Sequence, residues 1–343
     1  MRLIRLMEVA LCAVILTAAA TTARAADPVK IRIGWIAAPA NLAPILFAKP
    51  GIAQNLGKTY ELEPIRFNGS PPMITALNAG ELDIALLAYS SFALAIENAK
   101  MDDLRAIADD FQGNVPGYFT DGYLVLKDSP IKTIDDLKGK ILATNGVGGA
   151  IDIALRAALR NHKLEDKRDV VIVEAGLPSM KAMLVEHKVD LIPAVIPFAY
   201  DPELMKVSRM LFTQGESVGP TQTLLWAARA SFLQKNRAAM VDFMEDVLRA
   251  RRFYFDPKNH KEAVEIVSKF TKQPPEFFED WIFTNKDNYR DPDALPNLQS
   301  MQININKQKE LGFLKNDIDV PKYADLSITK EAGERLKKLD AAK

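Results

Sequence analysis

The segment Thr133–Arg160 constrains the fold most, because it reads as a short helix, a strand, a glycine-rich turn and a second helix in direct succession. Lys140–Thr144 is an apolar run of strand length, and Asn145–Gly149 follows it with three glycines. From Ala150 onward apolar residues recur at helical spacing, which predicts an amphipathic helix with one buried face. A turn this tight joins a strand to the helix that covers it, so the segment predicts an α/β unit.

The start of this helix is also a candidate binding site. The first N–H groups of a helix have no acceptor within it, and here they point into the glycine turn. Backbone N–H groups in such a place can hold an anion or a polar group of a ligand. A tight strand-to-helix connection that binds nothing is the alternative.

The order of strand, loop and helix recurs on both sides of this segment. Other strands are expected at Ile31–Trp35, Tyr60–Phe67, Leu82–Leu87, Val170–Glu174 and Asp190–Ile196. Helices are expected from about Leu42, from Ser70 to Ala79 and over Phe92–Asn98, with Ser70 as a cap and Pro71 in the first helical position. Alternation of this kind predicts mostly parallel sheets flanked by helices.

An internal repeat divides the chain into two parts. Four residues of a helix-then-strand pattern recur at an offset of 107 positions, where Pro71, Met73, Leu77 and Asp83 match Pro178, Met180, Leu184 and Asp190. The agreement predicts two lobes of similar plan, although a generic αβ pattern would explain part of it.

Two segments are expected to cross between these lobes and form a hinge. Gly122–Leu126 would lead out to the second lobe, and Thr221–Ala228 would lead back. Helical sequence then dominates and is expected to pack on the first lobe, over Phe232–Phe255, Lys261–Thr271, Pro275–Asn285 and Leu298–Leu311. The first lobe is therefore placed at residues 26–120 plus 222–343, and the second at residues 121–221.

The N-terminal 25 residues have the pattern of a cleavable secretory signal peptide. Arg2 and Arg5 precede an apolar run over Val9–Ala20, and an A-x-A cleavage pattern follows at residues 23–25. Cleavage there removes the one cysteine, Cys12, with three of the 44 basic and one of the 44 acidic residues, and leaves a net charge of about −2. The mature protein is therefore expected in the periplasm, without a disulfide and without a basic surface for nucleic acid.

Three stretches of the chain resemble a known protein family. They are IRIGW at residues 31–35, SPPMITALNAGELDIALLAYSS at 70–91 and VLKDSPIKTIDDLKGKILATNGVGG at 125–149. They are similar to the solute-binding proteins of ABC importers, in the branch that serves sulfonates, taurine, nitrate and pyrimidine precursors. The resemblance implies a two-lobed periplasmic-binding-protein fold of type II, which closes on a small ligand and delivers it to a permease in the inner membrane. It also implies a monomer without a cofactor.

In that family the loops after the strands face each other across the cleft and line the pocket, at the ends of strands where open α/β sheets bind ligands. Carried over position by position, the resemblance gives sixteen candidates: Trp35, Ala38, Asn41, Ser70, Tyr89, Ser90, Tyr118 and Trp226 from the first lobe, and Thr144, Asn145, Gly146, Gly148, Gly149, Glu174, Pro197 and Phe198 from the second. The expected roles are N–H groups and hydroxyls for an acidic head group, and aromatic rings for an apolar body.

Several of these candidates also fit a purely structural role, as core aromatics (Trp35, Trp226), a helix cap (Ser70), rings at a lobe edge (Tyr89, Tyr118) or a surface carboxylate (Glu174). No arginine falls in a predicted ligand loop, which counts against a doubly charged, sulfate-like ligand. A neutral or singly charged organic molecule, such as an aromatic one, fits the tryptophan and tyrosine content better.

An enzyme on a related fold is the rival interpretation. Related two-lobed proteins include enzymes of thiamine-pyrimidine synthesis and of tetrapyrrole assembly, and the second type attaches its cofactor through a cysteine that the expected mature chain lacks. The three histidines, His162, His187 and His260, fall near helix ends or turns, and the sequence has no nucleophile-elbow, zinc-protease or P-loop motif. No catalytic residue, metal ligand or cofactor is therefore expected. A third possibility, the sensing domain of a transcription regulator, is disfavoured by the signal peptide.

Overall fold

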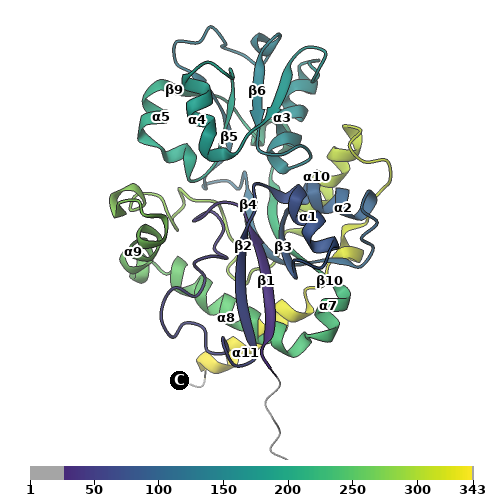
Figure 1. The fold of residues 1–343 in the computed structure, drawn as a ribbon, viewed down its shortest axis with the longest axis vertical. Coiled ribbons are helices and arrows are strands. Elements are labelled where there is room, and N and C mark those ends of the chain that lie inside the picture. Colours follow the sequence, from purple (N-terminus) through teal and green to yellow (C-terminus); the bar gives the residue numbers. More distant parts are fainter. Residues whose placement is uncertain (1–26, 342–343) are drawn as a thin grey trace, which may run out of the picture.

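The computed structural model describes residues 27–341, so the expected signal peptide and Cys12 lie outside the described part of the chain. Two lobes, each with β-sheet flanked by helices, lie one above the other in Figure 1. This arrangement confirms the α/β class and the two-lobed architecture that the sequence predicts. Among residues 27–341 no helix has both the length and the apolar character needed to cross a lipid bilayer.

The first lobe is built on a five-stranded sheet with the order β2-β1-β3-β10-β4. Its strands are β1 (Val29–Trp35), β2 (Tyr60–Arg66), β3 (Ile84–Ala88), β4 (Leu104–Gly113) and β10 (Thr221–Arg229). β1 is parallel to β2 and β3, whereas β10 runs antiparallel to both of its neighbours. The sheet is therefore mixed and not mostly parallel, because β10 re-enters the lobe that β4 leaves.

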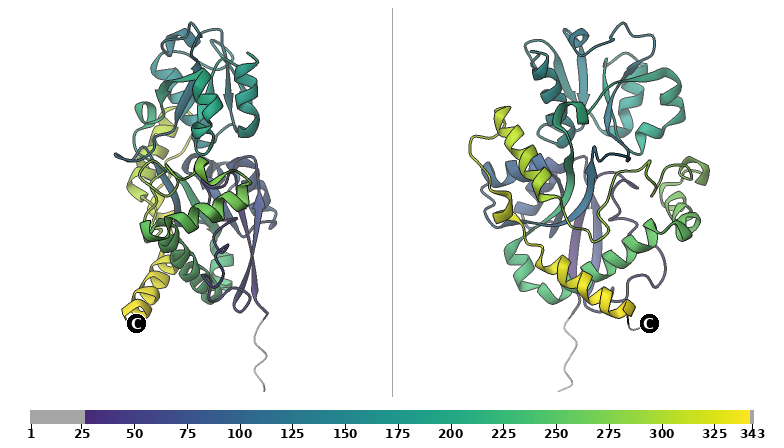
Figure 2. Two further views of the ribbon diagram at one scale, coloured as in Figure 1. Left: turned by 90° about the vertical axis from the view of Figure 1, so that its left-hand side faces the viewer. Right: turned by 180° about the vertical axis from the view of Figure 1, so that it is seen from behind.

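Helices cover this sheet with their apolar faces. They are α1 (Ser70–Asn78), α2 (Tyr89–Glu97), α7 (Ala230–Lys235), α8 (Arg237–Phe255), α9 (His260–Thr271), α10 (Leu298–Glu310) and α11 (Ser327–Ala341), with 3-10 turns at Pro257–Asn259, Pro275–Phe277 and Val320–Tyr323. The longest, α8, places Phe243 in the core between the rings of Trp226 and Tyr60. Seen from behind, α8 and α11 pack together at the end of the lobe that faces away from its neighbour (Figure 2).

The second lobe has a three-stranded antiparallel sheet, β8-β5-β9, and a parallel pair, β6-β7. Its elements are β5 (Gly122–Leu126), β6 (Ile141–Thr144), β7 (Val171–Glu174), β8 (Ile192–Ala194), β9 (Ser208–Thr213), α3 (Ala150–Asn161), α4 (Leu177–Val185), α5 (Pro202–Val207) and α6 (Gly215–Val218), with 3-10 turns at Asp135–Leu137 and Phe198–Tyr200. The N–H of Ala143 donates to the carbonyl of Leu191 at 2.9 Å, which joins β6 to the chain entering β8. The glycine turn thus lies between β6 and α3, as its sequence predicts.

The internal repeat of the sequence corresponds to a repeated structure. α1 and α4 both carry a proline in their first turn, and each is followed by a buried strand, β3 after α1 and β8 after α4. Asp83 accepts a hydrogen bond from the N–H of Arg32 in β1, and Asp190 accepts one from the N–H of Ile141 in β6, both at 2.9 Å. Equivalent carboxylates therefore brace the first sheet strand of each helix–strand repeat.

Two short segments connect the lobes: residues 114–121, and residues 214–220, which contain the short helix α6 that packs on α3. They are tied to each other, because Asn114 Nδ2 donates to the carbonyl of Gly219 at 2.8 Å. The N–H of Gln214 also donates to the carbonyl of Asp121, again at 2.8 Å. The two connecting segments therefore form a paired strap. The lobe limits that the sequence suggests, at 120/121 and 221/222, stay a prediction.

Several local expectations differ from the structure. The expected outgoing crossing, Gly122–Leu126, is strand β5 inside the second lobe, and the expected return crossing, Thr221–Ala228, is part of strand β10 inside the first. The chain after Leu42 forms turns and not a helix, and Pro44 in that stretch has no N–H to donate to a helical bond. The long helix expected after β10 is divided at Asn236, and Pro275–Asn285 forms a 3-10 turn followed by further turns. Strand β4 and helix α11 were not expected from the sequence.

Candidate functional site

A cavity of about 70 Å³ lies where the two lobes meet. The first lobe lines it with the loop after β1, the start of α1, the ends of β3 and β4 and the start of β10, and the second lobe with the glycine turn and the starts of α3 and α4. The connecting segment contributes Asp121. Most lining residues are apolar, so the cavity suits the body of a small organic molecule.

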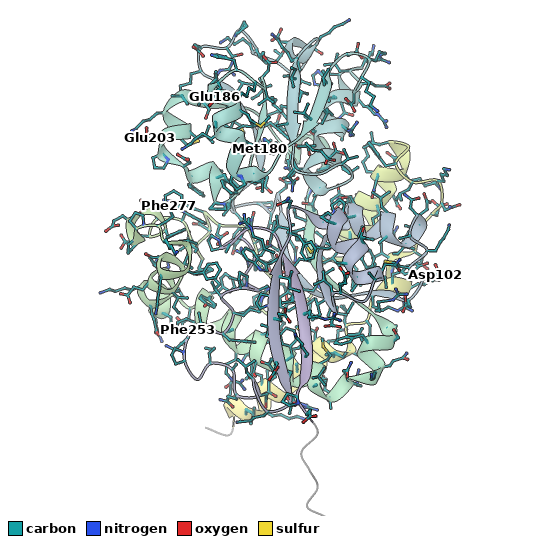
Figure 3. The ribbon with its side chains drawn as sticks, in the orientation of Figure 1. Asp102, Met180, Glu186, Glu203, Phe253 and Phe277 are labelled. Carbon is teal, nitrogen blue, oxygen red and sulfur yellow. The ribbon has the colours of Figure 1, made fainter. Side chains whose placement is uncertain are left out.

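A larger groove of about 550 Å³ lies beside the cavity, also between the lobes. Met180 of α4 lines it from the second lobe and Phe277 from the first, and Figure 3 shows these two side chains on either side of the junction. Leu177 lines both the cavity and the groove, so the two spaces adjoin at the start of α4. The groove therefore lies next to the cavity, with Leu177 between the two spaces.

Asn41 organises the loop after β1. Its Oδ1 accepts hydrogen bonds from the N–H groups of Ile36 and Ala37, both at 3.0 Å, and its Nδ2 donates to Asp110 at 2.7 Å. The other carboxylate oxygen of Asp110 accepts a hydrogen bond from the indole N–H of Trp226 at 3.0 Å. Asn41 lines the cavity, but its amide is bonded within the first lobe and shapes the wall.

Ser70 lines the cavity without capping α1, contrary to the sequence-based expectation. Its Oγ accepts a hydrogen bond from the N–H of Ala88 at 2.9 Å and donates to the carbonyl of Leu86 at 3.3 Å. The hydroxyl thus turns toward β3, and Gly69 takes the capping position. Ser70 therefore fixes the start of α1 against the end of β3.

The glycine turn forms part of the facing wall, but its amides are already bonded to carboxylates of the protein. The N–H of Val147 donates to Glu174 Oε1 at 2.8 Å, and the N–H of Gly148 donates to Asp152 Oδ2 at 2.9 Å. The turn was expected to present these N–H groups to an anion. The N–H groups of Val147 and Gly148 are therefore not available to an anion, and neither residue lines the cavity.

The first residues of α3 lie against the cavity. Ala150 and Ile151 line it, and N–H groups in the first turn of a helix lack an acceptor within that helix. Asn145 and Gly146 line the same side. The second lobe therefore presents a short row of backbone and amide groups to whatever occupies the cavity.

Direct contacts hold the lobes together around the cavity. The hydroxyls of Ser90 and Ser91 in α2 donate to the carbonyl of Gly148 at 2.9 and 3.1 Å. A second contact between the lobes is the stacking of the Tyr200 ring, from the second lobe, on Trp281 of the first lobe, with ring centroids 4.8 Å apart. The structure is thus a closed arrangement in which both lobes touch.

Gly148 of the second lobe packs closely against α2 of the first lobe. Its φ is +79°, and a Cβ built there would lie 2.8 Å from Leu94 Cδ1 in α2. We expect Gly148→Ala to lower the free energy of unfolding by about 1–2 kcal/mol, through left-handed backbone strain and displacement of Leu94. Gly139→Ala is the matched control, because Gly139 has a φ of +77° and open space around it. Urea unfolding of both variants measures the difference, and equal losses would mean that the contact with Leu94 contributes nothing.

Asp121 is the charged side chain of the cavity wall. It is 5% exposed, and its Oδ1 is buried without a hydrogen-bond partner in the described part of the chain. Burial, and next the negative charge of Asp287, raise the pKa of its carboxyl to about 7. Within residues 27–341 no arginine, lysine or histidine lines the cavity.

Two neighbouring buried aspartates show how different Asp121 is. Asp110 is bonded at both oxygens, as described above, and Asp109 accepts hydrogen bonds from Gln222 at 2.7 Å and from Arg251 at 3.1 Å. Most buried polar groups have such partners, so an orphaned carboxyl in a cavity wall points to a ligand. Asp121 is not among the sixteen sequence-based candidates, although its place directly before the apolar strand β5 was an available signal.

The structure brings part of the candidate set together. Five of the sixteen candidates line the cavity: Asn41, Ser70, Asn145, Gly146 and Gly149. Three line the outer groove: Ala38, Pro197 and Phe198. Two, Ser90 and Gly148, bond across the lobes, and three are buried inside a lobe: Tyr89, Thr144 and Trp226. Three lie outside both spaces: Trp35, Tyr118 and Glu174. Ligand contact for each of them stays a prediction.

With this geometry in place, comparison with known proteins identifies the family. The sequence model of the NMT1-like family matches residues 24–268. The chain belongs to the NMT1-like family. Among the described residues of this NMT1-like protein, no group of three or more histidine, cysteine, aspartate or glutamate side chains is placed to hold a metal ion.

Solved structures similar to this NMT1-like protein share its fold. The periplasmic aliphatic sulphonate binding protein SsuA from Escherichia coli has a TM-score of 0.65 and 18% identity, over 87% of this chain and 92% of that one. The periplasmic nitrate-binding protein NrtA from Synechocystis PCC 6803 has a TM-score of 0.70 and 18% identity, over 90% of this chain and 89% of that one. The desulfurization enzyme DSZB has a TM-score of 0.61 and 13% identity, over 90% and 99%. The fold therefore serves both binding proteins and an enzyme.

Proposed function

We propose that this NMT1-like protein is the periplasmic solute-binding component of an ABC importer, and that it captures a small organic molecule between its two lobes. The observation that carries the proposal is the central cavity, whose walls come from both lobes and from the segment that connects them. Two structural neighbours, SsuA and NrtA, are periplasmic binding proteins for aliphatic sulphonates and for nitrate.

The mechanism is closure about the paired strap of residues 114–121 and 214–220. A ligand in the cavity gains contacts with both lobes only when the lobes are together, so it shifts the population toward the closed form. The two lobes on either side of this strap would move as units, with the lobe limits proposed at 120/121 and 221/222. A permease in the inner membrane would recognise the closed form. The protein would act as an exported monomer that binds no nucleic acid and no cofactor.

An enzyme of the thiamine-pyrimidine-synthesis type is the second candidate, since DSZB shows that the fold can carry catalysis. Proton transfer chemistry generally uses more than one titratable group close to the substrate. The described cavity wall offers Asp121 alone. A binding protein returns its ligand chemically unaltered, so product analysis after incubation separates the two functions.

A substitution that fills the cavity tests the proposal. Ala150 is half-buried in the first turn of α3 and lines the cavity, so Ala150→Trp places an indole in a space of about 70 Å³. In a thermal-shift screen of aliphatic sulfonates, aromatic carboxylates, amines, nitrate and pyrimidines, we expect at least one compound to stabilise the wild type. We expect Ala150→Trp to abolish that shift, because stabilisation follows from binding to the folded state.

The matched control is Ala182→Trp, on the exposed face of α4 in the same lobe. It makes the same chemical change away from the cavity and should keep the wild-type response. A compound that stabilises wild type and Ala150→Trp equally would bind elsewhere, and the proposal would then be wrong.

A further inference from the structure

We propose that Asp121 receives a basic nitrogen of the ligand, so that this protein carries a small organic amine and not a sulfonate or nitrate anion. The inference deepens the proposed function and rests on the cavity being the ligand site. It assigns the class of ligand from the one charged group that faces the cavity.

The geometry around Asp121 supports this assignment. Its side chain is 5% exposed, and Oδ1 has no hydrogen-bond partner within the described residues. The titratable groups that act on it or feel its charge are Asp287 and Tyr123. Asp287 is itself paired with Arg290 at 3.1 Å, so that cation is already engaged. A protonated amine in the cavity would supply the missing partner.

The rest of the wall argues against an anionic ligand. No cationic side chain lines the cavity within residues 27–341, and an anion would lie near the Asp121 carboxylate. Two amides of the glycine turn, those of Val147 and Gly148, lie outside the cavity lining and are already bonded to Glu174 and Asp152. The start of α3 offers an anion backbone N–H groups but no full positive charge, so desolvating an anion beside the Asp121 carboxylate would cost more free energy than desolvating an amine there.

The test uses three probes of similar shape and different charge: butylamine, 1-butanol and butyrate. Their dissociation constants for the full-length mature protein at pH 8 are measured by ligand-detected NMR titration at constant ionic strength. We expect wild type to bind butylamine at least tenfold more tightly than butyrate, with 1-butanol between them. We expect Asp121→Asn to reduce that preference to less than threefold, because the amide carries no charge.

Asp128→Asn is the matched control, since Asp128 is an exposed carboxylate of the same lobe that does not line the cavity. It should keep the wild-type preference. Ala150→Trp should lose all three probes, which separates this inference from the proposed function. If butyrate binds wild type as tightly as butylamine, or if Asp121→Asn keeps the preference, the amine assignment is wrong while the cavity site stands. If no probe binds wild type, the amine assignment is wrong and the cavity site is decided by the thermal-shift screen with Ala150→Trp. If Ala150→Trp binds all three probes unchanged, the cavity site is wrong as well.

Discussion

Replacing Arg251 by leucine is expected to lower the free energy of unfolding by about 3–5 kcal/mol, because Asp109 then remains buried without its cation. Arg251 is 2% exposed, and its guanidinium donates to the Asp109 carboxylate at 3.1 Å and to the Asp109 carbonyl at 3.0 Å. It also donates to the carbonyl of Asp291 at 2.6 Å. These bonds anchor β4 against α8 and against the chain after α9.

Burial already raises the pKa of Asp109 to about 6, although Arg251 acts in the opposite direction. The free energy of unfolding that Arg251→Leu loses should therefore be smaller at pH 5, where Asp109 can take up a proton, than at pH 8. Arg252→Leu is the matched control, because the neighbouring Arg252 forms a partly exposed ion pair with Asp340 at 2.5 Å. Exposed pairs contribute about 0–1 kcal/mol. Urea unfolding of both variants at the two pH values gives the change in the free energy of unfolding. Equal decreases for Arg251→Leu and Arg252→Leu would show that the buried pair contributes no more to stability than the exposed one.

Asp121→Asn is expected to stabilise the ligand-free protein above pH 7. Burial raises the pKa of Asp121 from 3.8 to about 7, so the folded protein holds a proton that the unfolded chain releases between these values. The stability contribution of this group therefore falls as pH rises from about 4 to 7 and is constant above that range. A shift of this size corresponds to about 4 kcal/mol, so the variant should match wild type near pH 4 and exceed it by up to that amount at pH 8.

Urea unfolding of wild type and variant across this pH range gives the difference directly. Asp128→Asn should leave the pH profile unchanged, because Asp128 is exposed. A variant that is less stable than wild type at pH 8 would show that the Asp121 carboxylate is stabilised in the folded protein and is not available to a ligand. Many binding sites lower the stability of the ligand-free protein in this way, because their polar groups are arranged for the ligand.

Local patterns predicted the elements that depend on short-range spacing. The strand, glycine turn and helix around Ala150 appear where the apolar periodicity places them, and the offset repeat marks the braces Asp83 and Asp190. Elements fixed by tertiary contacts were missed or misread. Strand β4 carries Asp109 and Asp110, which are polar in sequence but partnered in the core, so its pattern does not read as a buried strand.

The candidate site was predictable in outline and not in detail. The order of elements places the loops after β1 and β6 at one junction, and the cavity lies there. Hydrogen-bond partners then decide what each residue does, and these come from distant parts of the chain. Asn41 is occupied by Asp110, the glycine turn by Glu174 and Asp152, and Asp121 is left without a partner. Sequence spacing alone carries no information on which of these groups stays free.

Closure of the two lobes on a ligand is tested most directly by measuring the distance between the lobes. Residues 27–341 contain no cysteine, so cysteines introduced at the exposed positions Asp102 in the first lobe and Glu186 in the second accept spin labels selectively (Figure 3). Pulsed electron spin resonance then gives the distribution of distances with and without the compound that produces the largest thermal shift. We predict that the compound narrows the wild-type distribution to a single closed distance and leaves that of Ala150→Trp unchanged. A wild-type distribution that does not respond to a compound the protein binds would contradict capture by closure of the two lobes.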